Sequence, residues 1–199
     1  NVETGTFVVD YMALTGFKVL PIVFFNGKTV NTKLTPFAWG GSSFSVADGE
    51  GATEGTNALH WIQGDEWGVG ATGAGWNISP AIDMAAAWKV DSLKFKMKTD
   101  VGVGALAWQI ESGDHKVKQL FEPESDGTWH QYALPLSDFS LVEGTALDTS
   151  AIGVLQIMSE GNSVVGQNIY IDDLWTGNPV IDIIPPAAPT GVSVVPATY

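Results

Sequence analysis

Hydrophobic and polar residues alternate with a period of two along several short segments of the chain. In the clearest segment, Leu93–Lys98, every second residue is apolar and the residues between are Lys. Such alternation is typical of a β-strand with one face in the core and the other in solvent. Turn signals such as Asp126-Gly127 separate the segments. The pattern predicts strands at Ala58–Gln63, Ser92–Thr99, Gly104–Ser112, Lys116–Glu122, Trp129–Pro135, Ile152–Met158 and Asn168–Trp175.

The spacing of these strands predicts an all-β fold, an antiparallel β-sandwich of the jelly-roll type. Helical composition is confined to the short stretch Ile82–Trp88. Near the N-terminus, Thr6–Asp10 and Phe17–Val23 could each form a strand. The 199 residues are enough for one domain with a well-formed core but too few for two ordinary ones.

A domain boundary is predicted close to the C-terminus. Pro185, Pro186 and Pro189 exclude a central strand and favour an extended linker. The stretch Ala188–Val194 resembles the opening strand of a fibronectin type III domain, although a simple Pro-rich tail is the alternative. We therefore expect residues 1–177 to form the β-sandwich and residues 178–199 to hold the linker and the start of a neighbouring module.

Charge and composition narrow the classes of partner. The chain has 22 acidic and 9 basic residues, a net charge of −13, and its basic residues are all Lys. This balance disfavours nucleic acid and anionic membranes, and no Arg is present for bidentate grip on phosphate. Because the chain has no Cys, disulfides, zinc–thiolate sites and thiol catalysis are excluded. No signal peptide or apolar run of transmembrane length is visible, and the chain begins at Asn1 without Met, so we expect a trimmed piece of a longer protein.

Three segments resemble parts of the jelly-roll carbohydrate-binding modules of families four, eleven and twenty-two. Asn168–Leu174 is similar to their last strand, and Trp129–Phe139 to a strand and turn common among them. Glu54–Leu59, followed by Asp65–Gly68, looks like their third and fourth strands. The resemblance covers most of residues 22–176. It implies a non-catalytic module that binds a polysaccharide or oligosaccharide and targets a secreted or cell-surface bacterial glycan-degrading protein to it.

The resemblance also implies a structural Ca²⁺ ion near the chain ends. Calcium prefers six to eight oxygen ligands. The positions that match the family's ligands are the side chains of Glu54, Asp172 and Asn26 and the backbone carbonyls of Phe24 and Asn57. Asn26 stands where such modules often carry an acid, which lowers the ligand charge. Asp173 is the alternative to Asp172, and the plain alternative to a metal site is a set of surface acids near turns.

Alternation also selects polar residues that face outward from the sheet. Gln109 and Glu111 alternate with core residues, and Gln156 lies between two apolar residues. In Val117–Leu120 the phase is ambiguous, so either Lys118 or Gln119 faces outward. If these strands share one sheet with Ser92–Thr99, Lys96 and Lys98 join the same face. Planar amides and carboxylates match sugar hydroxyls, so the predicted polar contacts are Lys96, Lys98, Gln109, Glu111, Gln119 and Gln156. The Lys cluster could favour an acidic glycan or protect the sheet from edge pairing, and a plain solvated sheet face is the alternative to a binding face.

Six of the eight Trp residues divide into two groups. Trp61, Trp108 and Trp129 alternate with core residues and are predicted to be structural. Trp39, Trp67 and Trp76 lie in or beside Gly-rich segments, so we expect them to be partly exposed and able to stack on sugar rings, with Trp67 as the first choice. An exposed Trp that acts only as a lid on the core is the alternative.

Two other classes of function share the predicted fold. A jelly-roll glycoside hydrolase needs two carboxylates on opposite sides of the scissile bond, and a polysaccharide lyase needs a base with a charge neutraliser. The strand motif Glu-x-Asp-x-x-Glu is absent from the sequence, and the nearest acidic run, Glu122–Asp126, passes through Pro123 into a turn. Without Arg and with three scattered His, a lyase is equally disfavoured. A structural or adhesive cell-surface spacer is the remaining alternative.

Overall fold

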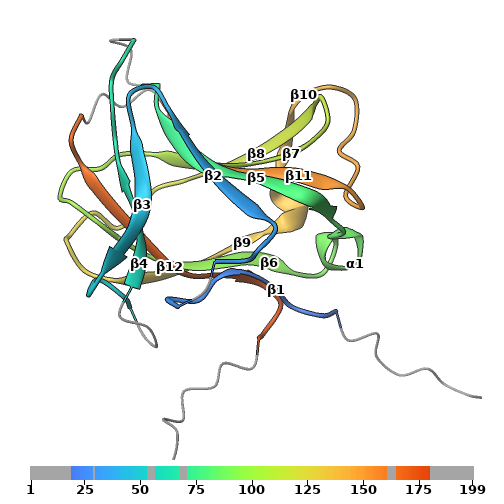
Figure 1. Cartoon of the computed structure of the whole chain (residues 1–199). Helices are drawn as coiled ribbons and strands as arrows, with labels where there is room; N and C mark the ends of the chain where they lie inside the picture. Colours follow the sequence, from blue (N-terminus) through green and yellow to red (C-terminus); the bar gives the residue numbers. More distant parts are fainter. Residues whose placement is uncertain (1–18, 29, 53–56, 68–70, 161–164, 180–199) are drawn as a thin grey trace, which may run out of the picture.

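The computed structural model describes residues 19–28, 30–52, 57–67, 71–160 and 165–179. They form a β-sandwich of two antiparallel six-stranded sheets that face each other as layers (Figure 1). The all-β antiparallel sandwich predicted from the alternation is therefore confirmed. The C-terminal linker and the predicted strand Thr6–Asp10 lie outside the described residues.

Sheet A has the strand order β3-β4-β12-β6-β9, and β1 also pairs with β12. The bounds of its strands are β1 Ile22–Phe25, β3 Ser43–Asp48, β4 Asn57–Ile62, β6 Ser92–Thr99, β9 His130–Pro135 and β12 Asn168–Thr176. Along β12, the partner changes from β4, which reaches Ile171, to β1, which begins at Leu174. Asp172 and Asp173 lie at this change of partner.

Sheet B has the strand order β10-β8-β7-β11-β5-β2. The bounds of its strands are β2 Leu34–Trp39, β5 Gly73–Ile82, β7 Leu106–Ser112, β8 His115–Phe121, β10 Ser140–Glu143 and β11 Ile152–Ser159. Two short helical segments, α1 (Ala85–Trp88) and the 3-10 turn η1 (Leu136–Asp138), connect strands. Both are too short to cross a membrane, and no longer apolar helix occurs among the described residues.

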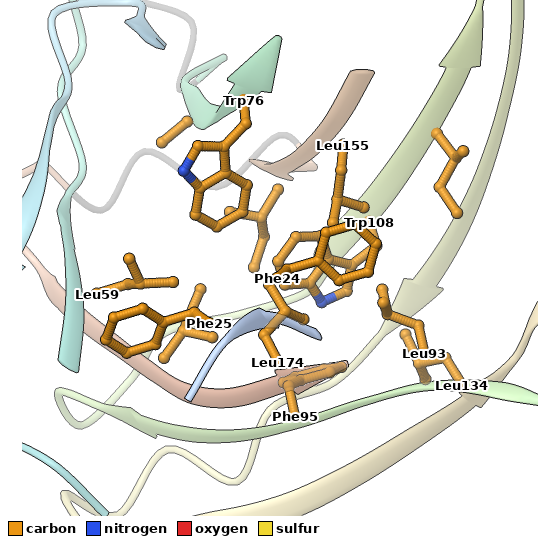
Figure 2. Close-up of a cluster of buried hydrophobic side chains, with 14 of the residues drawn as sticks. Phe24, Phe25, Leu59, Trp76, Leu93, Phe95, Trp108, Leu134, Leu155 and Leu174 are labelled. Carbon is orange, nitrogen blue, oxygen red and sulfur yellow. The ribbon is translucent and has the colours of Figure 1, made fainter. Parts of the chain in front are cut away.

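The core lies between the sheets and is rich in aromatic side chains (Figure 2). Trp61, Trp76 and Trp108 are each at most 1% exposed. Phe95 meets Trp108 edge to face, with ring centroids 5.5 Å apart. Each large apolar side chain removed from water contributes about 1.5–3 kcal/mol. The alternating apolar positions of β6 and β7 thus provide the force that holds the two layers together.

The seven central strands predicted from the sequence are present, with ends displaced by at most two residues. Four strands were not predicted: β2, β3, β5 and β10. Of the predicted Phe17–Val23, only Ile22 and Val23 belong to a strand within the described residues, and Asp65–Trp67 runs into a turn instead of forming a fourth strand. Ile82 ends β5, so the helix occupies only the last part of the predicted Ile82–Trp88.

Candidate binding surface on sheet B

The register of sheet B brings residues of four strands into one row on its outer face. Gln156 of β11 lies opposite Gln109 of β7 on one side and Gly75 of β5 on the other. Phe37 of β2 lies opposite Gly75. Because alternate residues of a strand share a face, Glu111 belongs to this face as well. The row therefore runs across the strands, from β2 to β7.

A hydrogen-bond network links the polar residues of this face. The amide nitrogens of Gln109 and Gln156 both donate to Oε1 of Glu111, each at 2.6 Å. The indole Nε1 of Trp39 donates to Oε1 of Gln156 at 3.2 Å. Gln109 is only 7% exposed and Gln156 only 8%. The network is thus largely shielded from water, where hydrogen bonds to a charged acceptor are strong.

Two Trp rings stack at one end of the row. The rings of Trp39 and Trp67 have centroids 5.7 Å apart and an interplanar angle of 24°. Trp39 lies over Gly73, where an added Cβ would come within 2.6 Å of its ring carbons. Trp67 is 56% exposed. An exposed ring above a rigid sheet is the kind of group that stacks on the C–H face of a sugar.

The segments next to the two Trp residues are tied to each other by hydrogen bonds of two hydroxyls and of the backbone. Ser42, which follows the turn after β2, accepts hydrogen bonds from the Trp61 indole at 3.0 Å and from the Gly64 amide at 3.2 Å. Its hydroxyl also bonds to that of Thr72, which precedes β5. The Glu66 amide donates to the Gly40 carbonyl at 3.1 Å. The positions of Trp39 and Trp67 are therefore fixed relative to each other before any ligand binds.

The lysines of the outer face of sheet B are paired with carboxylates. Lys118 lies 2.8 Å from Glu160, and Lys116 lies 2.7 Å from Glu143. The hydrogen bond between the latter two raises the pKa of Lys116 and lowers the pKa of Glu143. These ammonium groups are thus compensated within the protein.

The structure brings together five of the nine residues predicted to contact glycan: Trp39, Trp67, Gln109, Glu111 and Gln156. Trp76 is buried in the core beneath β5, so its expected exposure is wrong (Figure 2). Gln119 lies opposite Trp108 on the core-facing side of β8, and its strand neighbour Lys118 faces outward instead. The phase of that strand could not be read because it lacks a clear apolar alternation.

Lys96 and Lys98 lie on a different sheet from the other predicted residues. They belong to β6 in sheet A, where Lys96 pairs with Asp173 at 2.9 Å and Lys98 with Glu50 at 2.5 Å. Lys98 also lies over the ring of Tyr170, 4.5 Å from its centroid, and near Trp129. The condition that β6 shares a sheet with β7 is thus not met. Trp129, expected in the core, is half-buried beside Lys98.

Sequence reasoning missed three residues of this surface. Phe37 lies in the same row as Gln156, and the exposed Asn77 lies opposite Val154, next to that row. Gly73 provides the floor under Trp39. Phe37 alternates with Trp39, which is a usable signal, but Pro36 directly before Phe37 disfavours a central strand. β2 tolerates this proline because it is an edge strand of sheet B.

A hollow of about 280 Å³ lies between β2 and β3 at an open edge of the sandwich. Its walls are mostly apolar, with Phe44 and Trp76 among them. Such a lining offers few partners for sugar hydroxyls, so the outer face of sheet B is the better candidate for a glycan.

Asp172, one of the residues expected to bind calcium, lies where β12 changes partner from β4 to β1. Asp172 is fully buried, and its two carboxylate oxygens accept the backbone amides of Ala52 and Asp173, each at 2.8 Å. Burial raises the pKa of Asp172. Each of these oxygens keeps a lone pair that could face a cation.

The other expected calcium ligands are distributed around this point. The Phe24 carbonyl accepts the Asn31 amide at 3.0 Å, and the Asn26 side chain accepts the Lys28 amide at 3.2 Å. Asn57 begins β4. Glu54 lies outside the described residues, and among those described no three His, Cys, Asp or Glu side chains are grouped to hold a metal. The oxygen atoms of Asp172, Asn26 and Phe24 are of the chemical type that a hard cation such as Ca²⁺ prefers, and among them Asp172 alone is an acid.

Comparison with known proteins supports this description of the fold. No family model matches the chain, and no curated protein matches it significantly. Among solved structures, the family 30 carbohydrate-binding module of the cellulosomal cellulase Cel9D-Cel44B of Clostridium thermocellum is similar, with a TM-score of 0.62 and 12% identity over 82% of this chain and 100% of that chain. The family 11 module of Lic26A-Cel5E from the same organism has a TM-score of 0.56 and 14% identity, covering 81% and 96%.

An exo-β-agarase is similar as well, with a TM-score of 0.57 and 15% identity over 79% of this chain and 25% of that chain. At these identities the likeness defines the class of fold, the β-sandwich found in carbohydrate-binding modules. Family 11 was among the three families that the sequence resembles, whereas family 30 was not anticipated.

Proposed function

We propose that this chain is a non-catalytic carbohydrate-binding module that holds a neutral polysaccharide on the outer face of sheet B. The observation that carries the proposal is the row joining the exposed Trp67 ring to the network around Glu111. The similar structures add support, because one is a family 11 module in complex with a β-1,3-1,4-mixed-linked tetrasaccharide and another is a family 29 variant complexed with cellulohexaose.

The charges of the surface favour a neutral glycan over an acidic one. A carboxylated or sulfated chain needs cationic partners, but Lys116 and Lys118 are already paired with Glu143 and Glu160. Glu111 adds negative charge beside them. The net charge of −13 also repels a polyanion at longer range. Of the two roles that the sequence allowed for the Lys cluster, attraction of an acidic glycan and protection from edge pairing, these ion pairs disfavour the first.

The same surface supports binding without bond cleavage. Glycoside hydrolysis needs one carboxyl group as acid and a second as base or nucleophile. Glu111 accepts two amide hydrogen bonds, and Glu160 is paired with Lys118. Carboxylates held in this way are suited to fixing the positions of neighbouring side chains. We further propose that the module is secreted and directs an attached glycan-degrading protein to its substrate, as the cellulosomal origin of the similar modules suggests.

A structural Ca²⁺ ion is also proposed at the point where β12 changes partner. Asp172, Asn26, Glu54 and the carbonyls of Phe24 and Asn57 would hold it, and the ion would tie β1, β4 and β12 together. Binding at 100 times the dissociation constant stabilises a fold by about 2.7 kcal/mol. We expect EGTA to lower the melting temperature by several degrees, added Ca²⁺ to restore it, and Asp172→Asn to abolish the response. An equal melting temperature with EGTA and with Ca²⁺ would exclude the site.

Affinity electrophoresis across a polysaccharide panel tests the main proposal. The panel contains neutral mixed-linkage β-1,3-1,4-glucan, hydroxyethylcellulose and agarose, with alginate and polygalacturonate as acidic members. We expect retardation by at least one neutral glycan, none by the acidic ones, and no new reducing ends after long incubation. Retardation only by the acidic glycans, retardation by none, or the appearance of reducing ends would refute the proposal.

Paired Trp variants locate the surface on any glycan that retards the chain. Trp67→Ala removes the exposed ring, and truncating a buried aromatic anchor of an interface costs at least about 2 kcal/mol, a loss in affinity of more than about tenfold. Trp129→Ala is the matched control, because Trp129 lies beside Lys98 of sheet A. If Trp129→Ala abolished binding and Trp67→Ala did not, the binding face would lie on the other sheet.

A further inference from the structure

The Trp39 ring packs against two neighbours. Gly73 lies so close to it that a Cβ there would come within 2.6 Å of the ring. Trp67 stacks on the ring with a centroid distance of 5.7 Å. Trp39 is half-buried, whereas Trp67 is 56% exposed, so Trp67 has more ring surface free for a sugar.

The indole N–H of Trp39 is also fixed, by a hydrogen bond. Its Nε1 donates to Oε1 of Gln156. That acceptor points toward Trp39 because the other end of the same amide, Nε2, donates to Glu111 at 2.6 Å. Turning the amide around would bring two donors together at Trp39 and leave Glu111 without one of its partners. The orientation of Gln156, and through it the position of Trp39, therefore depends on Glu111.

Glu111 receives a second amide from the opposite side. Nε2 of Gln109 donates to the same oxygen at 2.6 Å. Gln109 and Gln156 are 7% and 8% exposed, so water cannot readily replace a lost acceptor. Leaving a buried donor without a partner is costly, whereas an exposed one would simply be hydrated. One carboxylate oxygen thus fixes two amides and, beyond them, the indole.

We propose that Glu111 is a positioning residue, that Trp39 is the fixed support, and that Trp67 is the member of the stacked Trp pair that offers a ring face to the glycan. The roles are stated for the glycan surface and so rest on the proposed function, but the coupling from Glu111 to Trp39 exists in the free protein. It divides residues that the sequence places in one group of sugar contacts. Glu111 and Gln156 act through Trp39, and Trp67 touches the ligand.

The Trp39 indole resonance in ¹H–¹⁵N NMR spectra of the full chain tests the coupling without any glycan. In Glu111→Ala we expect its Nε1–H to shift and to exchange with solvent about tenfold faster, because the loss of a hydrogen bond near 1.4 kcal/mol is a factor of ten. Glu111→Gln keeps a carbonyl acceptor without the charge and should fall between. Glu124→Ala is the control, since that carboxylate pairs with His130 and takes no part in the network.

Binding to mixed-linkage β-1,3-1,4-glucan tests the division of roles. Trp39→Phe keeps a ring beneath Trp67 but removes the N–H, so we expect it to retain more affinity than Trp67→Ala. Glu111→Ala should lose about tenfold, and Glu111→Gln less.

An unchanged Trp39 resonance in folded Glu111→Ala would overturn the positioning role, and so would one in Glu111→Gln should the alanine variant not fold. Equal losses in Trp39→Phe and Trp67→Ala would overturn the assignment of the ring face. If no polysaccharide of the panel binds, the proposed function fails, while the NMR result still decides the coupling.

Discussion

At the scale of single residues, the binding surface depends on a glycine beneath the Trp pair. Gly73 lies opposite Trp39 in the pairing of β5 with β2, so the Trp ring can lie flat across the neighbouring strand. Any side chain at this position would fill the space that the ring occupies. The glycine weakens the strand slightly, because glycine loses more conformational freedom on folding than other residues. In return, the Trp39 ring can lie close to the sheet, and this fixes where Trp67 stacks on it.

Gly73→Ala is therefore expected to reduce glycan affinity about tenfold or more while leaving the chain folded, since a displaced Trp39 loses its hydrogen bond and its stacking partner. Gly153→Ala is a matched control, because Gly153 lies in the adjacent β11 and an added Cβ there meets nothing within 4 Å. Titration with mixed-linkage β-1,3-1,4-glucan, with far-ultraviolet circular dichroism to verify folding, measures the effect. Wild-type affinity in Gly73→Ala would show that glycan binding does not depend on the position of Trp39 over Gly73.

A second residue-scale feature lies away from the candidate glycan-binding face, at the start of β9 and in the turn before it. The Nδ1 of His130 lies 3.1 Å from Glu124, and its Nε2 lies 2.9 Å from Asp126. The hydrogen bond to Asp126, with the charges of both acids, raises the pKa of His130. The same bond is the main reason that the pKa of Asp126 falls to about 2. The imidazolium form is thus favoured in the folded state.

This pair predicts how stability depends on pH. The contribution of His130 is complete below its unfolded pKa, about 6.5, and is lost as pH rises through the raised folded value. The contribution of Asp126 is present above its unfolded pKa, about 3.9, and is lost as pH falls toward about 2. The melting temperature of His130→Gln should therefore fall furthest below that of wild type between about pH 4 and pH 6.5. Because the group is near the surface, the difference is small, and a difference that is constant from pH 4 to pH 9 would contradict the prediction.

At the scale of elements, sequence patterns located the strands whose alternation is strict and missed those whose chemistry is irregular. β6 was predicted to the residue because Leu93, Phe95 and Met97 face the core in strict alternation. β5 was missed because Gly73, Gly75 and Pro80 break the pattern that a strand normally shows. Because β5 was not predicted, the burial of Trp76 was not predicted either.

Alternation along a strand also cannot tell which sheet the strand joins. Lys96 and Gln109 each point outward from their own strand, yet one lies on sheet A and the other on sheet B. Their assignment depends on long-range pairing of β6 with β12 and of β7 with β11, which local residue patterns do not encode. The stacking of Trp39 on Trp67 could not be predicted for the same reason, because the segment after β4 of sheet A lies against β2, an edge strand of sheet B.

That junction leads to a prediction for Ser42. Its hydroxyl accepts hydrogen bonds from the Trp61 indole and the Gly64 amide, which lie in β4 and directly after it, in the segment that continues to Trp67. Ser42→Ala should lower the free energy of unfolding by about 1–3 kcal/mol, because buried donors lose their acceptor, and should weaken glycan binding by loosening the Trp pair. Ser43→Ala, at the exposed neighbouring position, is the control. Urea denaturation of both variants measures the difference, and equal stabilities would show that the loops are held by other contacts.

At the scale of the whole molecule, the lysines on the outer faces of both sheets form ion pairs with acidic residues of the same chain. Lys94, Lys96 and Lys98 pair with acids beside sheet A, and Lys116 and Lys118 do so on sheet B. With 22 acidic and 9 basic residues, the chain carries a large excess of negative charge. The net negative charge therefore repels a polyanion at a distance, and on contact the lysines are already neutralised by their acidic partners. Neither effect opposes the binding of a neutral glycan.

The last prediction follows from this charge distribution. If binding rests on ring stacking and hydrogen bonds to neutral hydroxyls, no ion pairs form with the ligand and few counterions are released. The affinity for mixed-linkage β-1,3-1,4-glucan should then change by less than about twofold between about 0.05 and 0.5 M NaCl, although the Debye length falls severalfold over that range. The acidic polysaccharides should stay unbound even at high salt, because screening removes long-range repulsion without supplying cations to grip the chain. Isothermal titration at both salt concentrations measures this, and a steep fall in affinity with salt would mean that charged groups of the surface contact the ligand directly.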